Sequence, residues 1–393
     1  MIDKLRNQVA NTIWGQLEKL EPDFLPGGKY EKLHSVWDGN KTFLFAPPTT
    51  TKGNVHVRDG NDLKRTMFHV IIAMIPALLF GIYNVGFLHY TSFGEEFTFF
   101  QAIGYGLLKV IPIVVVSYAT GLAIEFAVAQ AKGHQIHEGF LVSGMLIPLV
   151  MPPDIPLWMV AVATAFAVIL AKEVFGGTGM NVLNIALTAR VFIFFAYPSY
   201  ISGDQVWISE KADAFSGATV LAQAANGQEL TYSAADMFLG FIPGSIGETS
   251  TLLILLGAAF LIVTGVGSWR VIVSVFAGAG LMGILCNAIG AAYFANEPNH
   301  FLNLPFYYHW IMGGLAFGAV YMATDPVTAS QTPKGKIIYG LLIGAFAVLI
   351  RVFNPAYPEG IMLSILLFNV FAPLIDYYVV QANVKKRLAR VAQ

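Results

Sequence analysis

The sequence contains little charge and a single cysteine. Lys, Arg, Asp and Glu make up 12% of the 393 residues, against roughly 25% in an ordinary soluble domain. The net charge of −1 leaves no basic surplus, so nucleic acid is not expected as a partner. One cysteine, Cys286, can neither form a disulfide within the chain nor supply the ligands of an iron–sulfur cluster. We expect it to be a buried thiol that packs like a small apolar side chain.

Several nucleotide-binding and catalytic motifs are also missing. The sequence has no P-loop, HExxH, GxSxG or dinucleotide-binding glycine fingerprint, which argues against ATP hydrolysis and against hydride transfer from NADH by this chain. His134 and His137 form an isolated pair, and zinc requires further ligands, so we predict no metal site. The first 25 residues lack the apolar core of a signal peptide.

Apolar residues, in contrast, are abundant and occur in long runs. They make up 56% of the chain, and the mean hydropathy is +0.62. The runs are about 20 residues long, the length of a helix that crosses a bilayer. These properties predict an all-α polytopic membrane protein with about ten transmembrane helices. The expected spans are 66–86, 104–124, 139–152, 156–172, 182–198, 251–267, 271–292, 309–324, 337–352 and 360–379.

The distribution of Lys and Arg predicts the orientation of these spans. Most basic residues fall on one side of the predicted arrangement, including four that follow the last span. Because basic residues favour the cytoplasmic side, both termini are expected in the cytoplasm. Five spans precede the longest loop and five follow it, so the halves face opposite ways, as in inverted repeats. The expected parts are a cytoplasmic arm (1–62), a first membrane half (63–198), a periplasmic loop (199–250), a second half (251–380) and a basic tail (381–393).

The third span of each half is unusual. The span 139–152 is short and ends at Pro152, whereas the span 309–324 contains a Gly-Gly pair. Short or Gly/Pro-interrupted spans at matching positions indicate a binding site near the middle of the membrane. Close packing of small residues produces the same pattern, so both explanations stay open here.

Two segments rich in glycine and serine lie in the 199–250 loop. Glycine lets backbone N–H groups approach an anion, and a helix start offers free N–H groups. Both properties suit a phosphate, and Thr219 would offer a hydroxyl oxygen for a phosphoester. A turn that caps a helix is the simpler explanation of either segment alone. The candidate residues are Ser216, Gly217, Ala218, Thr219, Gly244, Ser245, Gly247, Glu248 and Thr249.

A second glycine-rich turn is expected on the cytoplasmic side. Asn181 and Asn184 follow it one helical turn apart, so they share a face and could hydrogen-bond a planar polar ring. A plain helix-start turn explains this segment equally well. A further element, 323–330, contains Asp325, which can cap the helix that follows Pro326. The candidates in the glycine-rich turn are Gly176, Gly177, Thr178, Asn181 and Asn184.

Ionisable residues occur in or at the ends of predicted spans, where they are costly and therefore indicate function. They are Lys109, Glu125, Arg190 and Asp376. Carboxylates can bind Na⁺ or relay a proton. Snorkelling or a structural ion pair is the alternative for each of these residues.

Six short motifs, in order and on matching predicted sides of the membrane, resemble one family over nearly the full chain. That family comprises the B subunits of the Na⁺-translocating NADH:quinone oxidoreductases. The motifs are Glu138-Gly139-Phe140, Lys172 to Gly179 with Asn181 and Asn184, Phe194 to Pro198, Ser216 to Thr219, Pro243 to Ser250, and Ala323 to Ser330.

The resemblance implies a cofactor-bearing translocase component with a fold like that of urea transporters. FMN would be linked covalently to Thr219 on the periplasmic side, and a non-covalent riboflavin would lie in the membrane core. Thr219 would be an anchor, so no residue is assigned a catalytic acid–base role. Electrons would arrive from the FMN of the C subunit and reduce ubiquinone near the cytoplasmic face, coupled to outward Na⁺ transport. The implied partners are the other members of a six-subunit complex of the bacterial inner membrane, especially the C, D, E and F subunits.

The resemblance also implies roles for residues near the cytoplasmic side. The arm (1–62) and Gly121, one helical turn before Glu125, match the region that the family uses for quinone, so Gly121 and Glu125 are the quinone-binding candidates. Glu125, Asp325 and Asp376 match family acids, which makes them candidates for the Na⁺ path.

Two other functions are compatible with parts of this pattern. The D subunit of the Rnf ferredoxin:NAD⁺ oxidoreductase is homologous, but it is usually shorter and lacks an arm like residues 1–62. A flavin-free carrier of the urea-transporter type would need no loop like 199–250. The arm and the loop therefore favour the quinone-reducing complex.

Overall fold

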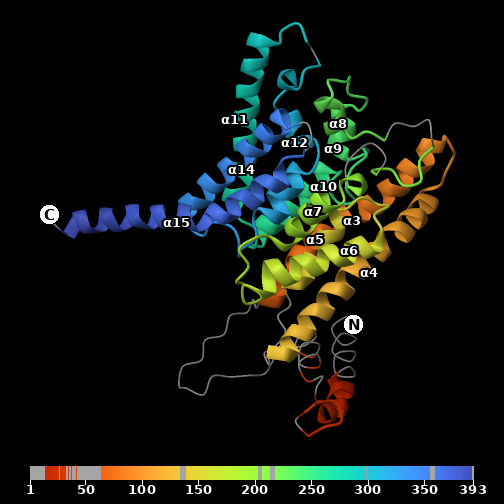
Figure 1. Cartoon of the computed structure of the whole chain (residues 1–393), viewed down its shortest axis with the longest axis vertical. Helices are drawn as coiled ribbons and strands as arrows, with labels where there is room; N and C mark the ends of the chain where they lie inside the picture. Colours follow the sequence, from red (N-terminus) through yellow and green to blue (C-terminus); the bar gives the residue numbers. More distant parts are fainter. Residues whose placement is uncertain are drawn as a thin grey trace, which may run out of the picture.

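The computed structural model describes an all-helical chain (Figure 1), with no strand among the described residues. Most of the predicted arm, the pair His134 and His137, and Ser216 lie outside the described residues. The described residues are 14–25, 27–31, 34, 37, 41, 63–132, 139–201, 206–212, 217–297, 299–354 and 359–391.

Five helices of the described chain are long and apolar enough to cross a membrane. Large apolar side chains such as Phe100 and Leu108 are exposed on their surfaces, as expected where lipid replaces water. Cys286 is buried in one of these helices, as predicted. The five are α3 (Leu63–Phe93), α4 (Phe99–Lys132), α11 (Trp269–Tyr293), α14 (Pro333–Phe353) and α15 (Ile361–Val391).

The other apolar segments are shorter or interrupted. Helical residues occur in all ten predicted spans, but the structure supports only the coarser description of a polytopic all-helical protein, and ten spans stay a prediction. The predicted span 309–324 is divided because Gly313 adopts φ +59°, a conformation that favours glycine. The shorter segments are α5 (Phe140–Leu149), α6 (Leu157–Phe166) with π-helix η2 (Ala167–Glu173), α7 (Ile185–Ala196), α10 (Thr251–Val263), α12 (Tyr308–Ile311), and α13 (Leu315–Phe317) with π-helix η5 (Gly318–Met322).

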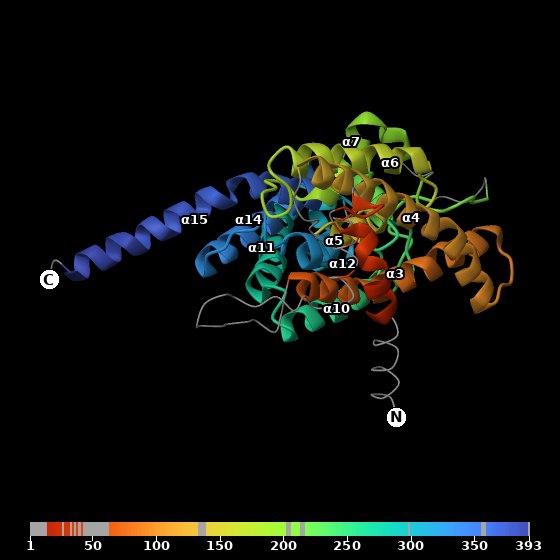
Figure 2. The same ribbon diagram turned by 90° about the horizontal axis from the view of Figure 1, so that it is seen from below.

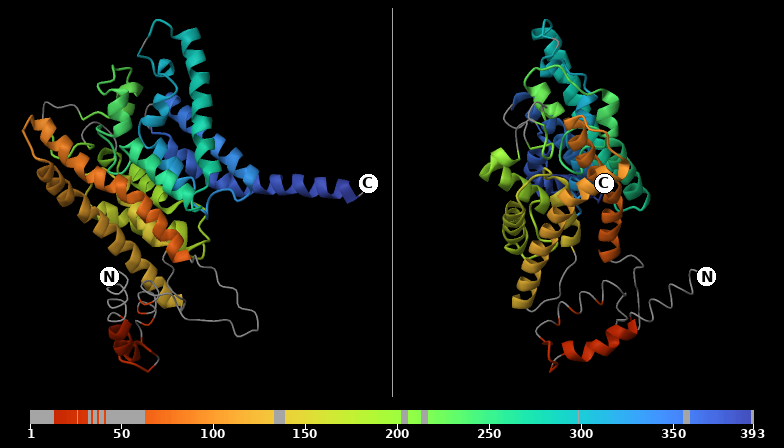
Figure 3. Two further views of the ribbon diagram at one scale, coloured as in Figure 1. Left: turned by 180° about the vertical axis from the view of Figure 1, so that it is seen from behind. Right: turned by 90° about the vertical axis from the view of Figure 1, so that its right-hand side faces the viewer.

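Glycines allow the long helices to pack closely. Helix α3 lies beside α4, and α11 lies beside α14 (Figures 1 and 3). A Cβ atom on Gly106 would collide with the carbonyl oxygen of Ile82, and one on Gly344 would collide with that of Val275. Small residues at such crossings let helix backbones approach each other in membranes.

Helix α15 leaves the body of the molecule and carries the C-terminal end away from α3 and α4 (Figures 1 and 2). The basic segment that the sequence predicts as a tail from 381 onward continues this helix to Val391. The described chain also contains a helical stretch at residues 14–24 and four short helices: η3 (Pro198–Tyr200), α8 (Val220–Ala225), α9 (Ala234–Leu239) and η4 (Phe301–Asn303).

Candidate functional site

A cavity brings together five of the nine predicted phosphate-binding residues. We call it the Thr219 cavity. Ala218 is buried directly before Thr219, and Gly247 lies behind the lining, where its N–H donates to the carbonyl oxygen of Leu149 (2.7 Å). The predicted residues that line the cavity are Thr219, Gly244, Ser245, Glu248 and Thr249; Arg190, Phe194, Trp207, Gly313 and Glu359 also line it.

Thr219 is the N-cap of α8. Its side-chain oxygen accepts a hydrogen bond from the backbone N–H of Ala222 (3.2 Å), as is usual for threonine before a helix. The residue is only half-buried and its side chain lines the cavity. Thr219 therefore caps α8 and also borders the cavity.

The loop before α10 is fixed to the end of α5. The N–H of Ile246 donates to the carbonyl oxygen of Met151 (3.2 Å), and Asn84 donates to the carbonyl oxygen of Ile242 (3.1 Å). Ser250 caps α10 by accepting from the N–H of Leu253 (3.4 Å). These contacts hold Ser245 and Glu248 at the cavity.

Arg190 is the buried cation of this cavity. It donates to the hydroxyl of Ser245 (2.9 Å) and to Glu359 Oε2 (2.7 Å), and its guanidinium carbon lies 5.7 Å from the centre of the Trp207 ring. The sequence identified Arg190 as an ionisable residue in a span but did not place it here. Trp207 and Glu359 were missed, because no local pattern signals their approach to Arg190.

Arg351 supports the cavity from behind. It is fully buried and donates to three backbone carbonyl groups, those of Glu359 (2.9 Å), His309 (2.7 Å) and Met312 (3.0 Å). Because Met312 precedes the Gly-Gly pair, these bonds fix the break between α12 and α13 next to the cavity.

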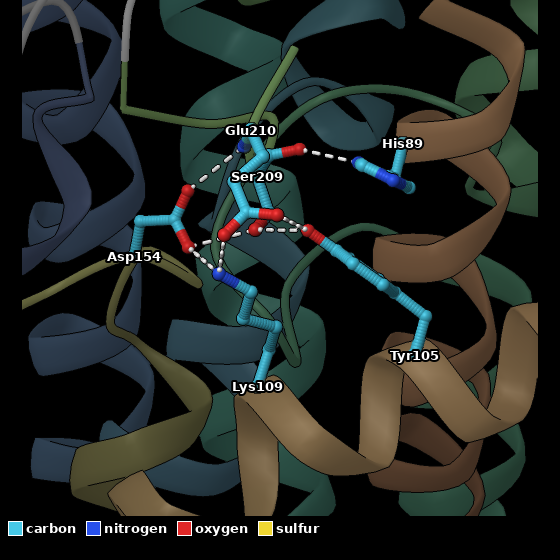
Figure 4. A network of polar contacts seen from close by, with 6 residues as sticks. All are labelled: His89, Tyr105, Lys109, Asp154, Ser209 and Glu210. Carbon is cyan, nitrogen blue, oxygen red and sulfur yellow. Dashed lines mark hydrogen bonds and ion pairs between the residues drawn. The ribbon is translucent and has the colours of Figure 1, made fainter. Parts of the chain in front are cut away.

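A polar network holds the segment that carries Trp207 (Figure 4). Lys109 donates to Asp154 Oδ1 (3.0 Å) and to Glu210 Oε1 (2.8 Å), and the hydroxyl of Tyr105 donates to Glu210 Oε2 (3.0 Å). The bonds from Lys109 and Tyr105 lower the pKa of Glu210. Glu210 adopts φ +45°, a strained conformation that persists only where neighbours impose it. The network thus fixes the segment 206–212.

A second cavity collects three of the five predicted residues of the other glycine-rich turn, and Gly176 and Gly177 lie outside its described lining. We call it the Asp325 cavity. Gly176 and Gly177, at φ +118° and +96°, turn the chain after η2. The two π-helices both end at this cavity, since Lys172 of η2 and Tyr321 of η5 line it; π-helical turns are frequent at functional sites. Its lining includes Lys172, Thr178, Asn181, Asn184, Tyr321 and Asp325.

Asn184 and Asp325 join the two halves of the sequence at this cavity. Asn184 Nδ2 donates to Asp325 Oδ2 (3.4 Å), while Asn184 Oδ1 accepts from the N–H of Leu187 and caps α7. Asp325 also accepts from the N–H of Val327 (3.0 Å) and the hydroxyl of Thr328 (3.2 Å). All of its described bonds come from neutral donors.

Glu125 is paired with a buried lysine. Lys172 Nζ donates to Glu125 Oε1. The side chain of Glu125 is 5% exposed, and that of Lys172 is 2% exposed. Lys172 therefore connects Glu125 to the Asp325 cavity. Gly121, one turn earlier, packs against Phe140, since a Cβ atom there would collide with the Phe140 ring.

Asp376 occupies a separate position. Its carboxylate accepts from the hydroxyl groups of Ser330 (2.7 Å) and Thr332 (2.6 Å) and from the N–H of Gln331 (2.7 Å). It tethers the loop after Asp325 and is absent from the described lining of the cavity. The three acids predicted for the ion path thus do not meet at one point of the described structure. Within the described ranges, no group of three His, Cys, Asp or Glu side chains could hold a metal ion.

Comparison with known proteins identifies the family of the chain. The NQR2, RnfD, RnfE family matches residues 50–385. The B subunit of the Na⁺-translocating NADH-quinone reductase of Chromohalobacter salexigens is 47% identical, and the alignment covers 96% of each chain. Proteins of the same name from Klebsiella pneumoniae and Pseudomonas aeruginosa are 44% and 45% identical, over 95% of this chain and 98% of theirs. The chain therefore belongs to the NQR2, RnfD, RnfE family.

Proposed function

We propose that the chain is the B subunit of a Na⁺-translocating NADH:quinone reductase and carries electrons through a flavin attached at Thr219. The observation that supports this most is the meeting of Thr219 with the 243–249 loop and Arg190 in one cavity. The relatives that are named as B subunits also align over 95–96% of the chain. These alignments extend beyond the family match of residues 50–385 and include part of the arm 1–62. The D subunit of the Rnf complex usually lacks such an arm, so the longer alignments favour the B subunit.

The residues of the Thr219 cavity fit FMN. The lining contains Phe194 and Trp207, whose rings would pack against a planar ring, and the half-buried Thr219, whose hydroxyl would provide the ester oxygen. Arg190 is already engaged by Ser245 and Glu359, so ion pairing alone would hold a phosphate weakly. That arrangement favours covalent attachment. When bound, the flavin would supply the redox chemistry, and the protein would supply position and electrostatics.

The Asp325 cavity suits the second, non-covalent flavin. Asn181, Asn184 and Thr178 line it, and amide and hydroxyl groups can hydrogen-bond a polar ring without adding charge. The neighbouring buried pair of Glu125 and Lys172 would influence that ring electrostatically. Ubiquinone near Gly121 and a Na⁺ path through Glu125, Asp325 and Asp376 complete the proposal.

The proposal places the chain in the bacterial inner membrane with both termini cytoplasmic. Ten spans in two inverted halves, of the urea-transporter type, would put the Thr219 cavity on the periplasmic side and the Asp325 cavity on the cytoplasmic side. The C subunit would deliver electrons to the first cavity, and the D, E and F subunits would contribute to the rest of the complex.

The first test is flavin fluorescence of this chain after denaturing electrophoresis. The protein must be produced with the flavin transferase, because attachment is enzymatic in the family. We expect a fluorescent band in the wild type and in Thr249→Ala, which removes another hydroxyl from the same cavity, and no band in Thr219→Ala. A dark wild-type band from a competent host would refute the flavin assignment and favour a cofactor-free carrier.

A further inference from the structure

Two carboxyl groups meet at the floor of the Thr219 cavity. Glu248 is 5% exposed, and its buried Oε1 atom has no hydrogen-bond donor among the described residues. A Cβ atom on Gly314 would lie 2.5 Å from Glu248 Oε1 and 2.9 Å from Glu359 Oε1, so both oxygens crowd the same glycine. The two carboxyl groups therefore lie close together in a buried site, and a proton is required on one of them unless nearby cations neutralise both.

The cations around this pair do not remove that requirement. Arg190, from α7, donates to Glu359 Oε2. Arg351, from α14, donates to the backbone carbonyl of Glu359. His309, from α12, is fully buried, and neither of its ring nitrogens has a hydrogen-bond partner in the described part of the chain. It therefore has no contact that would stabilise a charge on the imidazole.

Adjacent carboxyl groups in a buried site cannot both ionise readily. Burial, together with the negative charge of Glu359, raises the pKa of Glu248 well above its usual range. With one proton on the pair, the two arginines and two glutamates carry a net charge of about +1; without it, they are neutral. The proton thus sets the charge of the cavity floor.

We propose that Glu248 and Glu359 form a proton-binding site that keeps the floor of the Thr219 cavity positive and so favours an electron in that cavity. The inference rests on the proposed function. The only step is proton binding: at high pH one carboxyl O–H bond breaks and the proton goes to water. By linkage, an electron in the cavity strengthens the binding of the proton, and the proton strengthens the binding of the electron.

The test is a redox titration of the Thr219 flavin in the complete complex at a series of pH values. Glu248→Gln replaces the protonated acid by a neutral group that can also donate to Glu359. We expect its midpoint potential to match the wild type at low pH and to exceed it increasingly as pH rises and the wild-type pair loses its proton. Glu229→Gln, on the exposed turn after α8, should follow the wild type throughout. A difference that is the same at every pH would overturn the proposal.

A second measurement does not depend on the flavin. The infrared difference spectrum between the Thr219→Ala complex and the same complex with Glu248→Gln added should contain, at neutral pH, the carbonyl band of a protonated carboxylic acid. If the band is absent, the carboxyl pair is refuted even if wild-type flavin is present. If the band is present but the wild type lacks covalent flavin, the pair stands and the proposed function fails.

Discussion

The Thr219 cavity and the Asp325 cavity lie at the two ends of the same helix, α7, but they accommodate buried charge differently. In the Asp325 cavity, Lys172 is paired with Glu125, and Asp325 is hydrogen-bonded by neutral donors. In the Thr219 cavity, Glu248 retains an oxygen without a donor among the described groups. The Asp325 cavity thus supplies its buried acids with donors, whereas the Thr219 cavity places a second carboxyl group beside Glu248.

The largest expected effect concerns the buried pair of Lys172 and Glu125. Lys172→Met should lower the free energy of unfolding by about 3–5 kcal/mol, because it leaves Glu125 buried without its partner. The double variant with Glu125→Gln should recover much of that loss. Thermal unfolding of the purified complex in detergent measures both.

Lys132→Met is the matched control for this variant. Lys132 is 46% exposed and its Nζ lies 3.7 Å from Oε2 of Glu173, whose side chain is 10% exposed. Because solvent reaches the ammonium group, we expect a smaller loss of stability than for Lys172→Met. Equal losses of stability in the two lysine variants would contradict the view that the buried pair contributes more to stability than a partly exposed one.

The next effect separates packing from quinone binding beside the Asp325 cavity. Gly121→Ala should cost about 1–3 kcal/mol through overpacking against Phe140, and Phe140→Leu should relieve it. Gly104→Ala, in the same helix with no described atom within 4 Å of the added Cβ, should be neutral or slightly stabilising. If the double variant regains stability but its KM for quinone stays altered, Gly121 contacts the quinone. If both recover, Gly121 acts only through packing.

The smallest expected effect on stability concerns Asp376. Asp376→Asn weakens the bonds to the 330–332 loop and should cost about 1 kcal/mol. We expect it to slow Na⁺-dependent quinone reduction while leaving the flavin at Thr219 in place, since Asp376 lies outside that cavity. Ser330→Ala removes one of its donors but keeps the carboxylate. Unchanged Na⁺ dependence in Asp376→Asn would remove this residue from the ion path, and an equal change in both variants would assign the effect to the loop.

The sequence alone predicts those parts of the site that lie in continuous segments. Thr219 and the 243–249 loop are candidates because each is rich in small residues beside a helix start, and the structure places them in one cavity. Asn184 is predicted near a polar ligand, and it meets Asp325, which the sequence singles out separately. Apolar run lengths likewise locate the long helices.

The residues that the sequence does not predict act across long separations in the chain. Glu359 pairs with Arg190 from 169 positions away, and Lys172 pairs with Glu125 from 47 positions away. Nothing in the local pattern around Glu359 distinguishes it from a polar residue of a surface turn. Such pairs arise from how helices cross, which hydrophobic periodicity does not specify.

Helix α7 also has an electrical direction. Asn184 at its first turn borders the Asp325 cavity, whereas Phe194 in its last turn borders the Thr219 cavity, so about 15 Å of helix separates them. The aligned peptide dipoles place about half a positive charge at the Asn184 end and half a negative charge at the other. An electron that passes from the Thr219 cavity to the Asp325 cavity would move toward the positive end. The backbone of α7 would by itself make the second cavity the easier one to reduce, and so give the transfer a preferred direction.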